Sequence, residues 1–381
     1  TDTATAALGH NGVRTEAVAA SYATVGTAEY YTCDRCHEHF ADSACDNAIS
    51  DLEAWKTADG LIAAQKDDEA FTNGETNPYA IANMTDYLAF ATGEGVASAD
   101  LKKAYSQKFF KLLIDIGTES EPATVAIGSA TMYFAGTLDG NDKTAYVDLK
   151  LDCAAGFVTY LAGGTVKNLT VRGSVVRNST TSTSHVGGVV GLVTTAGGTI
   201  ENCNNYADVT TASASCTAGG IVGSVTGVAT ITNCNNYGGV IAENCKYVGG
   251  IVGYVSGGTL TLTGAENAGN VVGKTWVGGI VGLVNASGKT QTIDTVTVKD
   301  CEIKATKALD GTTKASLGGV MGRSSNSGIK YRNWTVTNVK FYVEGVETDC
   351  EYTDFTTKTD GNAKPGLMFG SSKGAFTLIA D

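Results

Sequence analysis

A short box with paired glycines recurs down the middle of the chain, and it constrains the fold more than any other feature. Each copy has a residue followed by two glycines, two apolar residues and a further glycine. The second glycines of the pairs are Gly188, Gly220, Gly250, Gly279 and Gly319, so the steps between them are 32, 30, 29 and 40 residues. A period near 30 in a glycine-rich chain is typical of a repeat architecture.

The segments between the boxes repeat as well. Each repeat holds three short apolar alternations: the box, a Thr-Ile-x-Asn-Cys segment and a final valine segment. Three short strands per repeat predict an all-β fold, a right-handed β-helix or β-solenoid of about six coils, with coils stacked roughly 4.8 Å apart. Like residues then form columns, among them one of Asn205, Asn236 and Asn267, whose amides should bond from coil to coil. We expect the glycines to permit positive φ and close backbone approach.

Charge and hydropathy exclude several classes of protein. The chain has 27 basic and 39 acidic residues and a net charge of −12, which argues against nucleic acid and anionic membranes as partners. It holds no run of 18 apolar residues, so we expect no membrane span. It starts at Thr1 without a basic and apolar leader, so we expect any signal peptide to have been removed or never present.

The ten cysteines are compatible with secretion and some disulfides. Neighbouring coils lie within the Cα separation that a disulfide tolerates. Cys216 and Cys245 lie near box entrances and are a candidate disulfide. Cys203 and Cys234 have a core-like context, and we expect them to be buried free thiols.

The N-terminal residues carry the one motif with a ligand chemistry, Cys33-Asp-Arg-Cys36-His37. Its form is that of a c-type haem attachment site, with Cys33, Cys36 and His37 as the residues involved. Its cysteine spacing also fits zinc, with His39, His10 or Cys45 completing a tetrahedral set, and we predict Cys33, Cys36, His39 and Cys45 as that set. The third interpretation is a small module without ligand, stapled by a disulfide or reduced. We expect the module to bind no cofactor. Of the two cofactors considered, zinc is favoured over haem.

Two parts of the chain resemble known families. Residues 16–42 resemble a short cysteine-containing repeat of secreted and surface proteins of gram-positive gut bacteria, with two departures: Tyr22 stands where that repeat has Cys, and His37 where it has Gly. The segments that begin at residues 163, 197, 227 and 257 resemble the GLUG motif family of extracellular bacterial proteins. The resemblance implies a β-helix that is secreted, extracellular or on the cell surface.

The chain is expected to have five parts. They are a CxxC module at 1–57, a linker at 58–80, a capping helix with entry strands at 81–143, the solenoid at 144–340, and an acidic stretch with a C-terminal strand at 341–381. The long last step between boxes predicts an inserted loop around 305–314. A solenoid end needs a cap because it otherwise exposes unpaired backbone.

These features favour a non-catalytic extracellular structural or adhesive protein, a surface or fibre subunit that assembles through its ends. Its partners would be copies of itself or glycans of a host or cell surface. The alternative is a carbohydrate-binding or carbohydrate-active β-helix. Its charged candidates on the solenoid are Arg172, Arg177, Lys246 and Asp208, and they form no recurring acid–base set. We therefore expect no enzyme and no catalytic residues. A haem or zinc protein is the second alternative.

Overall fold

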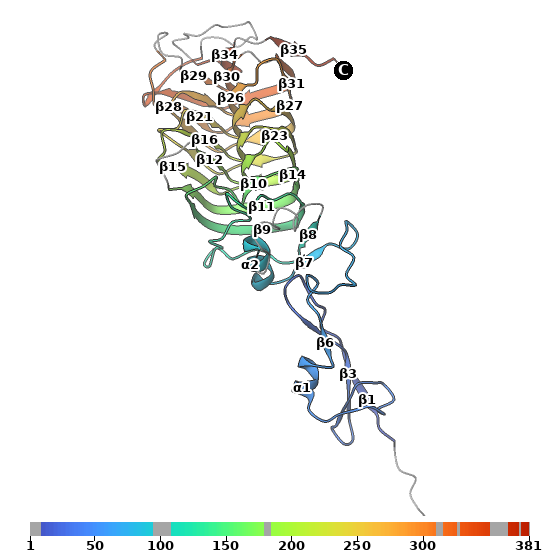
Figure 1. The fold of residues 1–381 in the computed structure, drawn as a ribbon. Coiled ribbons are helices and arrows are strands. Elements are labelled where there is room, and N and C mark those ends of the chain that lie inside the picture. Colours follow the sequence, from blue (N-terminus) through green and yellow to red (C-terminus); the bar gives the residue numbers. More distant parts are fainter. Residues whose placement is uncertain are drawn as a thin grey trace, which may run out of the picture. The chain divides into compact units, whose positions relative to one another are not determined.

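The computed structural model describes residues 9–93, 108–178, 184–309, 315–325, 328–350, 365–372 and 375–380 (Figure 1). The chain divides into two compact units, Thr1–Phe90 and Ala91–Asp381. Among the described residues, no helix combines the length and apolar character needed to span a membrane.

The N-terminal unit is a small sheet module. Its four-stranded sheet has the order β1-β3-β4-β5, and β2 pairs with β6. Its core brings together Cys33, Phe40 and Cys45, with Tyr31 packed against them. The segment expected as a linker supplies β6, so it is paired with the module. The elements are β1 (Gly12–Thr15), β2 (Gly26–Thr27), β3 (Tyr30–Cys33), β4 (His39–Phe40), β5 (Ala48–Ile49), α1 (Leu52–Thr57), β6 (Leu61–Ile62) and β7 (Tyr79–Ile81).

Helix α2 (Met84–Thr92) lies where the sequence predicts the capping helix, and it spans the boundary between the two units. Its Asp86 is fully buried and accepts hydrogen bonds from Ala23 N (2.8 Å), Thr24 Oγ1 (2.9 Å) and Ala82 N (2.9 Å). These bonds satisfy the buried carboxylate, which would otherwise be costly. Asp86 therefore anchors the start of the helix within the N-terminal unit.

The second unit is built of long parallel sheets, in which strands from successive repeats lie side by side (Figure 1). One sheet has the order β10-β13-β17-β22-β26-β30-β34 and another β12-β16-β21-β25-β29. The strands of these two sheets are β10 (Val158–Leu161), β13 (Val190–Val193), β17 (Val222–Val225), β22 (Val252–Ser256), β26 (Val281–Asn285), β30 (Met321–Ser324), β34 (Phe369–Ser372), β12 (Ser184–Gly187), β16 (Cys216–Gly219), β21 (Tyr247–Gly249), β25 (Trp276–Gly278) and β29 (Ser316–Gly318).

The remaining strands of this unit continue the same stacking. Strand β11 pairs in parallel with β9 on one side and with β14 and β15 on the other. Antiparallel pairing joins β32 and β33. The strands are β8 (Phe109–Leu112), β9 (Thr137–Leu151), β11 (Thr165–Arg177), β14 (Gly198–Asn205), β15 (Asp208–Thr211), β18 (Val228–Thr232), β19 (Asn235–Asn236), β20 (Val240–Ile241), β23 (Thr259–Asn267), β24 (Val271–Gly273), β27 (Thr290–Lys299), β28 (Glu302–Ala305), β31 (Gly328–Thr337), β32 (Lys340–Val343), β33 (Val346–Glu347) and β35 (Phe376–Leu378).

The glycine box differs from the expectation in two ways. The box does not form a single strand, because its glycine pair ends one strand and begins a bend before the next, as between β16 and β17. The paired glycines also have ordinary φ values. Positive φ falls instead on Asn168, Asn202 and Asn233, at 54°, 50° and 52°. The expected close approach is confirmed: a Cβ at Gly220 would overlap the carbonyl oxygen of Gly250 in the next repeat.

The structure thus confirms an all-β fold with long parallel sheets, compatible with a β-helix. The right-handed sense, the number of about six coils and the capping role of the helix stay predictions. Part of the expected inserted loop, residues 310–314, lies outside the described residues, as do residues 351–364 of the acidic stretch. The expected C-terminal strand is present as β35, paired with β31.

Candidate functional site

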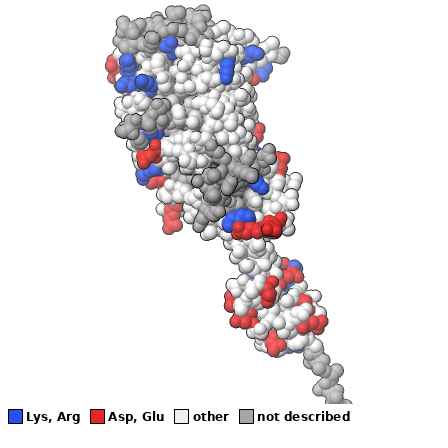
Figure 2. Space-filling view, in the orientation of Figure 1, with Lys and Arg blue, Asp and Glu red and all other residues white. Residues whose placement is uncertain are grey.

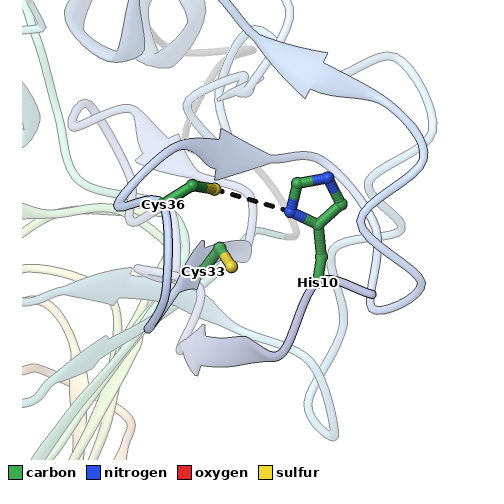
Figure 3. Close-up of side chains that lie close together, drawn as sticks. All are labelled: His10, Cys33 and Cys36. Carbon is green, nitrogen blue, oxygen red and sulfur yellow. Dashed lines mark hydrogen bonds between the residues drawn. The ribbon is translucent and has the colours of Figure 1, made fainter. Parts of the chain in front are cut away.

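Three ligand-bearing side chains meet at one edge of the N-terminal module (Figure 3). Ligand atoms of His10, Cys33 and Cys36 all lie within 4.8 Å of one another, and Cys36 Sγ is 3.5 Å from His10 Nδ1. Strand β1 runs antiparallel to β3 with Gly12 opposite Cys33, which places His10 beside the Cys33–Cys36 turn. Cys33 is fully buried, whereas His10 and Cys36 are exposed.

The turn favours a thiolate at Cys33. Hydrogen bonds from the backbone amides of Asn11, Cys36 and Arg35, in that order, lower the pKa of Cys33 to about 6. The backbone amide of Glu38 acts to lower the pKa of Cys36, but burial of its sulfur, the hydrogen bond to Cys33 and the charges of Cys33 and Glu38 outweigh it and raise that pKa. The two sulfurs therefore share one environment in which a single negative charge is favoured.

The structure separates the other candidate ligands of this motif from the cluster. His39 Nδ1 is 3.0 Å from Thr32 Oγ1, on the neighbouring strand. Cys45 packs in the core of the module with Cys33 and Phe40 and is not part of the group of ligand atoms. His37 is exposed and has a φ of 62°, a conformation that favours glycine, which is the residue of the resembling repeat at this position. His10, one of the alternatives, is thus the histidine that joins Cys33 and Cys36.

The predicted column of asparagines is present in the interior of the solenoid. Asn205, Asn236 and Asn267 are fully buried. Asn205 Nδ2 donates to Asn236 Oδ1 and Asn236 Nδ2 donates to Asn267 Oδ1, each at 2.8 Å. Each Nδ2 also donates to the backbone carbonyl two residues later, at 2.8 to 2.9 Å. The column holds the coils together through amides that have no contact with solvent, so its role is structural.

A second asparagine ladder, which we did not predict from the sequence, runs along the surface. Asn233 Nδ2 donates to Asn202 Oδ1 (3.2 Å), Asn202 Nδ2 to Asn168 Oδ1 (3.1 Å), and Asn168 Nδ2 to Asp139 Oδ1 (3.0 Å). These asparagines have positive φ, which Asn tolerates better than other side chains. The Asn that precedes Cys203 and Cys234 in each repeat is the signal that could have identified this ladder.

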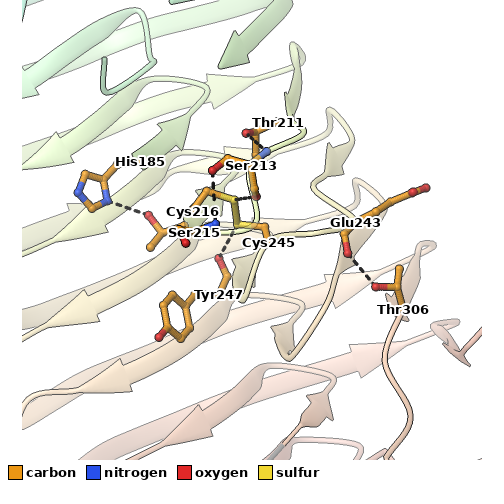
Figure 4. Close-up of a disulfide and its surroundings, with 10 residues drawn as sticks. His185, Thr211, Ser213, Ser215, Cys216, Glu243, Cys245, Tyr247 and Thr306 are labelled. Carbon is orange, nitrogen blue, oxygen red and sulfur yellow. Dashed lines mark hydrogen bonds between the residues drawn. A yellow bond between two sulfur atoms is a disulfide. The ribbon is translucent and has the colours of Figure 1, made fainter. Parts of the chain in front are cut away.

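Cys216 and Cys245, the candidate pair, form a disulfide between adjacent repeats, with a Cα–Cα distance of 5.1 Å (Figure 4). Cys203 and Cys234 are free and buried, and burial raises the pKa of Cys203. Near the disulfide, His185 Nδ1 is 3.0 Å from Thr217 Oγ1. Burial, and then the charge of Arg177, lowers the pKa of His185 to about 4.

A groove of about 590 Å³ lies on the second unit, beside the first strands of the solenoid. Tyr146 and Asp148 on β9, Arg172 on β11 and Tyr206 after β14 contribute to its lining. We call it the tyrosine groove. The Arg172 guanidinium lies 4.1 Å from the centre of the Tyr206 ring. Tyr206 is 41% exposed and stacks on Tyr237 of the next repeat, with ring centres 4.7 Å apart.

The charges in the tyrosine groove are suited to binding. Hydrogen bonds from Lys150 and then Ser174 lower the pKa of Asp148, so this carboxylate stays ionised and is a poor proton donor or acceptor near neutral pH. In the view of Figure 2, charged side chains of both signs are scattered between broad uncharged areas of the solenoid. Of the other charged candidates, Arg177 is buried and donates to the carbonyls of Asp152 and Cys153, and Lys246 lies in a separate hollow. The structure does not bring them together.

The fold and these sites define an all-β protein with parallel sheets of the β-helix type. A comparison with solved structures finds a similar fold in the crystal structure of a "putative immunoglobulin A1 protease" from Bacteroides ovatus. The TM-score is 0.54 and the identity 18%, over 79% of this chain and 86% of that chain. At this identity the likeness concerns the fold alone. No protein-family model and no curated protein matches the sequence, so the GLUG resemblance stays a prediction.

Proposed function

We propose that this protein is a non-catalytic extracellular structural or adhesive protein, a surface or fibre subunit built on a right-handed β-helix of about six coils. The observation that carries the proposal is that side chains along the solenoid are engaged in contacts between repeats. Polar and aromatic groups pair with the same position in the next repeat, as Asn202 does with Asn233 and Tyr206 with Tyr237. Such ladders make a stiff, repetitive surface, and they leave few side chains to converge on a reacting atom.

Assembly through the ends is the finer part of the proposal. Among the described residues, the seven-stranded sheet that begins with β10 ends at β34. An end strand offers backbone groups that can pair with a strand of another chain. Contacts of this head-to-tail type build open filaments when they do not close into a ring. Sedimentation velocity at rising concentration, followed by negative-stain microscopy, tests this. We expect a concentration-dependent series of linear assemblies, and a monodisperse monomer at the highest concentration would contradict it.

Carbohydrate binding is the second candidate, and the tyrosine groove favours it. The faces of the Tyr206 ring are covered by Arg172 and Tyr237, but its exposed edge can contact a sugar, while Asp148 and Arg172 can bond hydroxyl or carboxylate groups. A glycan array probed with the whole chain tests this, with Tyr206→Ala as the groove variant. Tyr342→Ala is the matched control, because Lys304 lies over the Tyr342 ring (4.7 Å) as Arg172 lies over that of Tyr206.

We expect Tyr206→Ala to lose at least tenfold in affinity for the bound glycan and Tyr342→Ala to bind as the wild type does. Equal binding by both variants would exclude the groove. Cleavage of immunoglobulin A1, the activity in the name of the Bacteroides ovatus protein, is not proposed for this chain. Incubation of the purified protein with immunoglobulin A1 should leave the immunoglobulin uncleaved, and cleavage would contradict the non-catalytic function.

A further inference from the structure

The cluster of His10, Cys33 and Cys36 in the N-terminal module is independent of the solenoid and of its proposed function. In a tetrahedral zinc site, bond lengths of roughly 2.3 Å to sulfur and 2.0 to 2.1 Å to nitrogen place sulfur and nitrogen about 3.6 Å apart. The distance from Cys36 Sγ to His10 Nδ1 is 3.5 Å. The third ligand atom, from Cys33, lies within 4.8 Å of both. A single ion can therefore contact all three with small side-chain adjustments.

The backbone holds these ligands in place without help from a metal. Cys33 N donates to Glu38 O (2.9 Å) and His37 N donates to Cys33 O (2.9 Å), which closes the turn around the two cysteines. Asp34 N donates to Asn11 O (3.1 Å), which ties that turn to the segment carrying His10. The His10 ring also packs 4.7 Å from the ring of Phe40, as measured between centres. Ligands positioned in this way lose little conformational entropy on binding.

Two soft thiolates with one imidazole favour zinc over magnesium or calcium, which prefer oxygen ligands.

The module also has a reason to need an ion. The described apolar cluster of its sheet is small: it holds Cys33, Phe40 and Cys45, with Tyr31 packed against them. A core of this size stabilises a fold weakly, and small modules usually rely on a metal or a disulfide in addition. We propose that His10, through Nδ1, and Cys33 and Cys36, through Sγ, bind one Zn²⁺ ion that stabilises the N-terminal module, with solvent in the fourth position. The fourth position is open because His10 and Cys36 are exposed.

Titration of the full-length protein with Co²⁺, under reducing conditions, tests the site directly. We expect one equivalent to give visible bands of tetrahedral cobalt together with near-ultraviolet bands of thiolate bound to cobalt, and one equivalent of Zn²⁺ to abolish both. His10→Ala and Cys36→Ser change exposed residues, so these variants should fold. Each should weaken Zn²⁺ binding at least tenfold in competition with a chelator.

His37→Gly is the matched control, because it removes a neighbouring histidine and places glycine at a positive φ. It should bind Zn²⁺ as the wild type does. Chelation should lower the melting temperature of the module in the wild type and not in His10→Ala. Absence of the thiolate bands, equal affinity of His10→Ala and wild type, or a disulfide between Cys33 and Cys36 in the protein purified from its native compartment would each overturn the proposal.

Discussion

The buried asparagine column allows a quantitative test of how the coils are held together. Asn236 is the middle member, and we consider Asn236→Val. Valine is the natural occupant at both ends of the column, because Val171 pairs with Asn205 and Val298 with Asn267. The substitution therefore fits the space and the strand, and it removes only the amide. Its cost should come from hydrogen bonds.

The magnitude follows from three contacts. Asn236 Nδ2 donates to Gly238 O (2.9 Å) and to Asn267 Oδ1 (2.8 Å), and Asn236 Oδ1 accepts from Asn205 Nδ2 (2.8 Å). Each bond contributes about 1 kcal/mol, and the amide groups left unpaired in the interior add about 1 to 3 kcal/mol. Burial of the valine offsets about 1 kcal/mol. We expect the free energy of unfolding to fall by about 3 to 5 kcal/mol.

Replacing all three asparagines of the column by valine distinguishes a loss of stability due to unpaired amides from a loss due to altered packing. The triple variant leaves no buried side-chain amide without its partner, so its loss should be less than twice that of Asn236→Val rather than three times it. Asn233→Gly is the control on the exposed ladder. Gly264 occupies the next position of that ladder with a φ of 69°, so glycine is accepted there. We expect this control to change stability by less than about 0.5 kcal/mol.

Urea unfolding followed by far-ultraviolet circular dichroism measures these differences, provided that the slope with urea concentration is unchanged among the variants. A stack of repeats can unfold in parts, so a changed slope would be checked by hydrogen exchange at the column. The reasoning is refuted if Asn236→Val lies within about 1 kcal/mol of the wild type, or if the triple variant loses the full sum of three single losses.

Three further predictions concern the solenoid. Gly250→Ala should prevent correct stacking, because its Cβ would overlap the carbonyl oxygen of Gly279. Gly257→Ala has open space around it and should lower the stability by only about 1 kcal/mol, because of its positive φ. Soluble yield and the urea midpoint of unfolding compare the two variants. Reduction of the disulfide between Cys216 and Cys245, which are 29 residues apart, should cost about 3.5 kcal/mol, and a Cys216→Ala, Cys245→Ala variant should show no further effect of reductant. Folding lowers the pKa of His185 from 6.5 to about 4, so the unfolded chain binds the proton at a higher pH than the folded chain does. As the pH is lowered from 6.5 to 4, the free energy of unfolding should therefore fall, by at most about 3 kcal/mol. His185→Gln should flatten this part of the curve of stability against pH.

The sequence was sufficient for the parts of the fold that repeat. The period of the boxes predicts the parallel stacking, and the context of each cysteine distinguishes the free pair, Cys203 and Cys234, from the bridged pair, Cys216 and Cys245. Columns can be predicted because a residue in one coil meets its own equivalent in the next. This reasoning fails wherever the contact joins different kinds of segment.

The N-terminal cluster is a case of that failure. Cys33 and Cys36 are identified by their spacing, but the choice of histidine depends on the antiparallel pairing of β1 with β3. His39 is three residues from Cys36 along the chain and yet turns to Thr32, whereas His10 is 26 residues away and lies at 3.5 Å. The tyrosine groove was missed for another reason. Arg172 and Tyr206 are equivalent residues of successive repeats, because Val171 pairs with Asn205, but this exposed position changes from arginine to tyrosine and shows no repeated residue type in the sequence.

The positions opposite the glycine pairs show which constraint produces the box. Gly220 and Gly250 face asparagines of the buried column, whereas Gly279 faces Val298 and Gly319 faces Val336. The asparagine is therefore not the reason for the glycine. At all four positions, an added Cβ would also overlap a backbone carbonyl oxygen of the following repeat, which cannot move without separating the coils. Close approach of backbones at the bend thus requires glycine in every copy, and the column is free to change from amide to valine where the ladder ends.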